Sequence, residues 1–232
     1  MKLRGIWHSD TTYLQEPPMG SMLLAREVQE QLERAGIKTM LTRRSDTYVE
    51  RGARADLARK AKADLFVSLH VNSLARRRGY TEIRGFETYF LAEARTEDAA
   101  RVAKMENDAV RFETGDNEAP MSGGLDFILK DLQLNEHLRE SARVAELVQR
   151  GLKGVHTGDD RGVKQAGFMV LTTARRPAIL VEMGYSTNPQ DGRFLTARSS
   201  QRAMASAIAD AVVEYLREYE RKTGSADGGV PQ

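Results

Sequence analysis

Residues 64–70, with the sequence Asp-Leu-Phe-Val-Ser-Leu-His, decide the fold. This short apolar run is rich in the branched and aromatic residues that are typical of a buried strand. Amphipathic helices are predicted over residues 22–35 and 52–63, where apolar side chains recur at helical spacing. A further strand is predicted between them, over residues 37–43. Helix and strand alternate twice, which favours an α/β sheet with parallel pairs.

Strands and helices are also predicted in the rest of the chain. We expect strands over residues 84–92, 163–172 and 178–183, and helices over residues 96 to about 113, about 125–153 and 201–221. A Gly- and Pro-bearing break at residues 115–124 indicates a connector inside a helical insertion of about residues 96–135. The prediction is therefore one domain over residues 1–222, followed by a disordered tail over residues 223–232.

Composition excludes several classes of protein. Among 232 residues there is no Cys, which excludes disulfides, Cys-ligated zinc, iron–sulfur clusters and thiol nucleophiles, so any metal must bind His, Asp or Glu. The net charge of +2 gives no reason to expect nucleic acid as the partner. No apolar run approaches the roughly 18 residues of a membrane span. The first residues contain no signal peptide, so we expect an intracellular chain or a mature or truncated form.

Two residues at strand ends are candidates for chemistry. His70 ends the strand at residues 64–70, and the carboxyl ends of strands in open α/β sheets are where ligand crevices form. Glu182 closes the apolar strand Ile-Leu-Val-Glu, where a carboxylate must be paired, metal-bound or exposed at a cleft. Together they suggest metal-assisted hydrolysis, with His70 as a zinc ligand and Glu182 as the general base. The alternatives are a hydrogen-bonded structural His and an ion-paired Glu, and a metal site needs at least one further ligand.

Ordered blocks of sequence carry a family resemblance. They are residues 36–43, 63–72, 85–89, 161–166, 168–171 and 177–185, together with Asp46, Arg54 and Asn188. In this order they resemble the zinc-dependent N-acetylmuramoyl-L-alanine amidases, the type 3 catalytic domain of cell-wall amidases, over about residues 22–219. The resemblance implies a mixed, largely parallel β-sheet flanked by helices. It also implies hydrolysis of the peptidoglycan amide between N-acetylmuramic acid and L-alanine.

The family pattern assigns roles to particular residues. Its zinc ligands are a His in an Asp-Pro-Gly-His-Gly-Gly loop, a Glu at the start of the first long helix, and the His of a Ser-x-His-x-Asn strand. His70 matches the last of these, Asn72 follows it as a substrate-binding candidate, and Glu182 matches the catalytic Glu. The Asp-Pro-Gly-His-Gly-Gly loop does not occur in this chain. We expect His8 and Glu16 to replace the missing ligands; the alternatives are an incidental His and a carboxylate favoured by the helix dipole.

Two further charged residues are candidates near the site. Lys164 is expected to polarise the scissile carbonyl or to bind a stem-peptide carboxylate, with a surface lysine as the alternative. Glu87 is expected to orient His70 through its second ring nitrogen, with a cross-strand ion pair as the alternative.

The helical insertion suggests regulation. It lies where some cell-division amidases carry a helix that covers the zinc site until an activator displaces it, and Glu106-Asn107 resembles that helix. The alternative is a solvated helix that lengthens the substrate groove. Because the first-ligand motif is missing, a catalytically impaired protein that binds peptidoglycan or regulates its hydrolysis is the alternative function. The resemblance implies a location in the periplasm or cell wall.

Overall fold

The computed structural model describes residues 4–9, 19–45, 49, 51–108, 132–172 and 174–224. Its centre is a six-stranded sheet with the order β2-β1-β3-β6-β4-β5. The strands are β1 (Arg4–Ser9), β2 (Lys38–Leu41), β3 (Leu65–Asn72), β4 (Phe86–Leu91), β5 (Asp160–Ala166) and β6 (Ala178–Tyr185). Four neighbouring pairs are parallel, and β4 runs antiparallel to β6. The predicted mixed, largely parallel sheet is confirmed.

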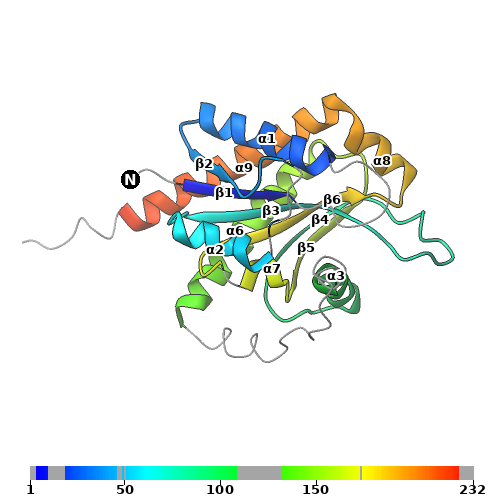
Figure 1. Ribbon diagram of the computed structural model, residues 1–232, viewed down its shortest axis with the longest axis horizontal. Helices are drawn as coiled ribbons and strands as arrows, with labels where there is room; N and C mark the ends of the chain where they lie inside the picture. The colour runs from blue at the N-terminus through cyan, green and yellow to red at the C-terminus, as the bar shows by residue number, and fades with distance from the viewer. Residues whose placement is uncertain are drawn as a thin grey trace, which may run out of the picture.

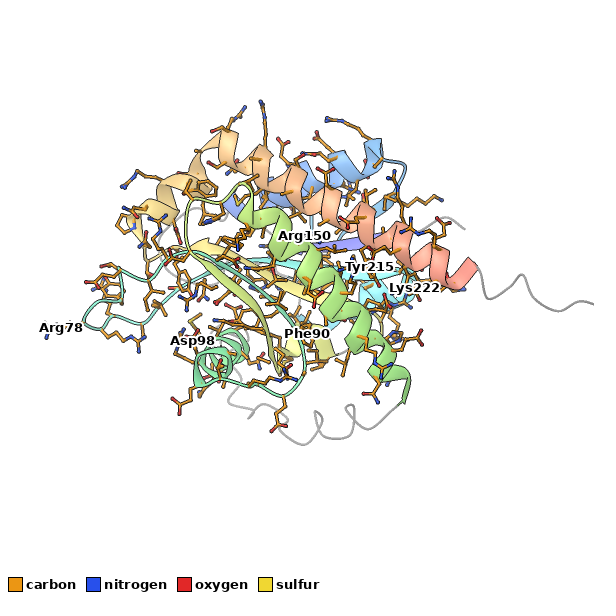
Figure 2. The ribbon with its side chains drawn as sticks, turned by 180° about the vertical axis from the view of Figure 1, so that it is seen from behind. Arg78, Phe90, Asp98, Arg150, Tyr215 and Lys222 are labelled. Atoms are coloured by element: carbon orange, nitrogen blue, oxygen red, sulfur yellow. The ribbon has the colours of Figure 1, made fainter. Side chains whose placement is uncertain are left out.

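Helices cover both faces of this sheet (Figure 1). The seven described helices are α1 (Met19–Arg34), α2 (Arg51–Lys60), α3 (Glu97–Asp108), α6 (Leu132–Lys153), α7 (Met169–Thr172), α8 (Pro189–Thr196) and α9 (Arg198–Gly224). One core cluster packs α1, α6 and α9 against the sheet, and Figure 2 shows α6 and α9 side by side on that face. A second, smaller cluster packs α2, α3 and α7 against the opposite face.

Alternation along the strands divides their side chains between the two faces. On β3, Leu65, Val67 and Leu69 belong to the larger cluster, whereas Phe66 belongs to the smaller one. By the same period of two, Ser68 and His70 point to the face covered by α2, α3 and α7. The candidate chemistry therefore lies on the face with the smaller core, at the carboxyl end of β3.

Three elements differ from the sequence prediction. The strand predicted over residues 163–172 is wrong in its second half, because β5 ends at Ala166 and the short helix α7 follows. The β-branched and apolar residues there favour a strand, but they pack as one helical turn against α2 and β4. Strand β1 and helix α8 were not predicted. Helix α8 begins at Pro189, with Asn188 as its N-cap.

Candidate active site

A row of three residues crosses the sheet at the candidate site. His70 on β3 is the register partner of Glu182 on β6, and Glu182 is in turn the register partner of Glu87 on β4. Register partners project to the same face, so the three side chains share the face covered by α3. All three are buried, with exposed fractions of 2%, 0% and 0%. His70 and Glu182, the two strand-end candidates from the sequence, thus lie on neighbouring strands.

Helix α3 brings a fourth side chain into this row. Oε2 of Glu106 lies 3.1 Å from Nδ1 of His70, and the Glu106 side chain is only 8% exposed. The other ring nitrogen of His70, Nε2, lies 2.9 Å from Oγ of Ser68. Ligand atoms of His70, Glu106 and Glu182 all lie within 4.8 Å of one another. A carboxyl group from a helix thus reaches the imidazole at the centre of the site.

The sequence of α3 explains how it docks. Its buried residues are Ala99, Val102, Ala103 and Glu106, which recur at helical spacing on one face. At the start of the helix, Oγ1 of Thr96 accepts a hydrogen bond of 3.1 Å from the amide of Ala99. Glu106 therefore continues the apolar stripe that faces the sheet.

Asn107 fixes the last turn of α3. Its Nδ2 donates to the carbonyl of Gly167 at 2.8 Å, and its Oδ1 accepts from the amide of Met169 at 2.9 Å. These bonds tie the helix to the connection between β5 and α7, beside the position of Glu106. Two paired hydrogen bonds to the main chain define the depth at which α3 sits.

Glu87 is the centre of a network of buried hydrogen bonds. Its Oε1 accepts from Nδ2 of Asn72 and from the hydroxyl of Tyr185, each at 3.0 Å. Its Oε2 accepts from Nε of Arg161 at 3.2 Å and from Nζ of Lys164 at 2.5 Å. These four contacts agree with the alternative for Glu87, an ion pair across neighbouring strands. The orientation of His70 by Glu87 stays a prediction.

Lys164 and Arg161 also contact α3. Nζ of Lys164 lies 2.8 Å from Oδ2 of Asp98, and a terminal nitrogen of Arg161 lies 3.2 Å from the same oxygen. Burial acts to raise the pKa of Asp98, but hydrogen bonds from Lys164 and Arg101 and their charges outweigh it and hold that pKa well below its usual value. Asp98 is therefore a carboxylate anion at neutral pH.

The other predicted site residues fall in different places. Asn72 is buried, and besides its bond to Glu87 it accepts a hydrogen bond from the amide of Ser73. The backbone of His8 pairs with Ser68 in the parallel ladder between β1 and β3. Glu16 lies outside the described residues.

The donor set fits a metal ion with nitrogen and oxygen ligands. One imidazole and two carboxylates converge in a buried place, which is the chemistry of divalent zinc sites that lack Cys. Buried carboxylates side by side repel one another unless a cation or a proton compensates them. The residues that the structure describes therefore fit a metal, and the sequence alone offered Glu106 only through the resemblance of its helix.

Together, fold and site define an α/β protein with a group of possible metal ligands, His70, Glu106 and Glu182, on one face of its sheet. The model of the N-acetylmuramoyl-L-alanine amidase family matches residues 21–214, so the chain belongs to this family of cell-wall hydrolases. The match begins at residue 21, after the N-terminal residues that stand in place of the family's Asp-Pro-Gly-His-Gly-Gly loop.

Individual relatives agree with this membership. The chain is 28% identical to N-acetylmuramoyl-L-alanine amidase AmiA of Escherichia coli, across 87% of this chain and 68% of the relative. It is 30% identical to AmiC of Neisseria meningitidis, across 87% of this chain but 47% of that protein. The solved structure of AmiC2 of Nostoc punctiforme superposes with a TM-score of 0.66 at 25% identity, covering 94% of this chain and 98% of that one. The CwlD amidase of Clostridioides difficile, solved in complex with the GerS lipoprotein, shares the fold with a TM-score of 0.62 at 18% identity, covering 92% and 98%.

None of the described helices combines the length and apolar character required to cross a bilayer.

Proposed function

We propose that the protein is a zinc-dependent amidase that cleaves the bond between N-acetylmuramic acid and L-alanine in peptidoglycan. The observation that carries the proposal is the pairing of His70 with Glu182 across β3 and β6, on the sheet face that α3 covers. Family membership supplies the substrate class. The site of action is then the periplasm or the cell wall, where peptidoglycan lies.

In this proposal His70 is a zinc ligand and Glu182 is the general base. Bound zinc would supply a Lewis acid that polarises the scissile carbonyl and makes water easier to deprotonate near neutral pH. The carboxylate of Glu182 lies on the strand next to His70, where it accepts a proton from water and returns it to the leaving amine. Its burial excludes competing solvent and strengthens its interaction with the reacting groups.

The remaining ligands belong to the proposal as well. We assign His8 as a ligand because its backbone runs beside β3, in register with Ser68. Glu16 is assigned as a ligand on the sequence resemblance alone. We assign Lys164 and Asn72 as substrate-binding residues, because hydrogen bonds to Glu87 hold both side chains at the site. Glu106 is an additional carboxylate at the site while α3 is docked.

We propose further that α3 inhibits the enzyme and that an activator protein displaces it. Docked as described, Glu106 occupies the place beside His70 that a substrate carbonyl or water needs. The structural neighbour CwlD was solved in complex with the GerS lipoprotein, so an amidase of this fold can bind a partner protein. Removal of α3 would be an exchange between two discrete arrangements of one segment.

Purified sacculi and zinc test the proposal directly. Wild-type protein and Glu106→Ala are incubated with sacculi, and released peptides with N-terminal L-alanine are identified by mass spectrometry. We expect slow release by the wild type and faster release by Glu106→Ala. If neither protein releases peptide although zinc is bound, the amidase proposal fails and a binding or regulatory role on the amidase fold takes its place.

A further inference from the structure

Helix α3 carries two carboxylates that rest on two different parts of the sheet. Glu106, in its last turn, lies against His70, and Asp98, in its first turn, lies against Lys164 and Arg161 on β5. Figure 2 shows the first turn of this helix, with Asp98 labelled, beside the sheet. Helix α3 therefore covers the site with a carboxylate at each of its ends, as a ligand with two carboxylates would.

The charges around Arg161 and Lys164 do not balance without Asp98. These two side chains bring two positive charges to the site. Glu87 supplies one negative charge that stays in place, because its side chain is 0% exposed and belongs to strand β4. The second negative charge comes from Asp98, on the helix that covers the site, where Arg101 of the same helix also pairs with it. When α3 is displaced, Asp98 and Arg101 leave together, and one positive charge of Arg161 and Lys164 is left uncompensated at the edge of the site.

The two cations are suited to bind a carboxylate. The Arg161 and Lys164 side chains are 24% and 18% exposed with α3 in place, and Asp98 is 38% exposed, so this cluster lies at the surface. A guanidinium and an ammonium that converge on one carboxylate oxygen form charge-assisted hydrogen bonds, which are stronger than neutral ones. Glu87 holds both cations on their other side, so the arrangement is preorganised.

The spacing along α3 gives the position of the ligand carboxylate. Asp98 and Glu106 lie eight positions apart in the sequence, which corresponds to about 12 Å along a helix. An extended peptide covers that length in about three to four residues. If Glu106 stands near the scissile bond, the carboxylate at Arg161 and Lys164 belongs to a residue about three positions further along the peptide.

We propose that Arg161 and Lys164 form a subsite for a carboxylate on the peptide of the substrate, about three residues from the scissile bond, and that Asp98 occupies this subsite while α3 is docked. The inference rests on the proposed function, because it takes the scissile bond to lie at His70 and Glu182. It adds Arg161 as a specificity residue and gives Asp98 the role of an internal competitor.

The test measures binding, so that it does not depend on turnover. Two muramoyl tripeptides that differ only in a carboxylate or a carboxamide on the third residue are titrated by calorimetry against the zinc-loaded full chain. All proteins carry Glu182→Gln to prevent cleavage and Glu106→Ala so that α3 does not mask the site. The quantity compared is the ratio of the two dissociation constants. Asp98→Asn is compared with Glu97→Gln, a matched change of an exposed carboxylate on the same turn.

We expect Asp98→Asn to prefer the carboxylate peptide by about tenfold, since a hydrogen-bonded charge pair is gained. Glu97→Gln should keep the smaller preference of the parent protein. Adding Arg161→Gln to Asp98→Asn should bring the ratio close to one. Equal binding of both peptides by Asp98→Asn would overturn the subsite, and so would a preference that Arg161→Gln leaves intact. If Arg161→Gln does not fold, as judged by circular dichroism, the comparison of Asp98→Asn with Glu97→Gln decides alone.

Failure of the subsite can be told apart from failure of the amidase proposal. Digestion of sacculi by Asp98→Asn in the Glu106→Ala background, with Glu182 intact, is measured in parallel. Digestion without a preference between the two peptides overturns the subsite only. A preference without any digestion supports the subsite and counts against the amidase reaction.

Discussion

Nδ1 of His70 lies 3.1 Å from Oε2 of Glu106, and this contact joins the centre of the sheet to helix α3. The same His70 is the register partner of Glu182 on β6. One imidazole therefore faces both the residue proposed as the base and the residue that covers it. The covering helix and the proposed chemistry compete for the same atoms, which is why the first predictions concern α3.

Loss of the Glu106 carboxylate should activate the enzyme. We expect Glu106→Ala to release peptide from sacculi about 10 to 100 times faster than the wild type, because it removes the buried contact that holds α3 against His70. Glu97→Gln, on the exposed side of the same helix, is the control and should leave the rate unchanged. A rate for Glu106→Ala at or below that of the wild type would show that α3 does not inhibit.

Asn107 offers a way to loosen α3 without changing a charge. Asn107→Ala removes the hydrogen bonds to Gly167 and Met169, each of which is worth about 1 kcal/mol. We expect a smaller rise in activity than for Glu106→Ala, together with faster amide hydrogen exchange in residues 97–108. Unchanged exchange in this segment would contradict the role of Asn107 in docking.

The buried carboxylate of Glu87 should be important for stability. Glu87→Gln keeps the shape of the side chain but leaves Arg161 and Lys164 without their buried counter-charge. We expect the free energy of unfolding to fall by about 2 to 4 kcal/mol, measured by urea denaturation. Glu97→Gln should change it little. A loss as small as that of the control would mean that Asp98 alone compensates both cations.

His156 should make stability depend on pH. Burial lowers its pKa from the usual value of about 6.5, and its Nδ1 accepts a hydrogen bond from the amide of Gly158, which requires the neutral ring. The folded state thus binds this proton more weakly than the unfolded state does. Stability is present in full above about pH 6.5 and is lost as the pH falls toward the lowered pKa of the folded state. His156→Gln should show a smaller loss of unfolding free energy between pH 7.5 and 5.5, and an equal loss would exclude His156 as the cause.

Much of the fold could be predicted from hydrophobic patterns. The buried strands that contain His70 and Glu182 are short apolar runs, which is why both strands could be predicted. The predicted strand was wrong at residues 169–172, because one turn of apolar helix and a short strand can have the same composition. Periodicity cannot separate the two at this length.

The charged contacts of the site could not be predicted in the same way. The sequence does not say that Glu87 turns toward Arg161 and Lys164 and away from His70, because a side chain at a given register can reach several neighbours. Asp98 was missed for a related reason: an acidic residue in the first turn of a helix is ordinarily explained by the helix dipole. Its pairing with β5 depends on how α3 docks, and docking is a long-range property.

The separation of metal binding from turnover in Glu182→Gln tests the central claim most directly. Zinc content per chain and the rate of peptide release from sacculi are measured on the same preparation, in the Glu106→Ala background so that α3 does not mask the site. If Glu182 is the base, we predict that zinc content stays near that of the parent while the rate falls by about 100- to 10,000-fold. Loss of zinc in proportion to activity, or a rate that survives the substitution, would contradict this account.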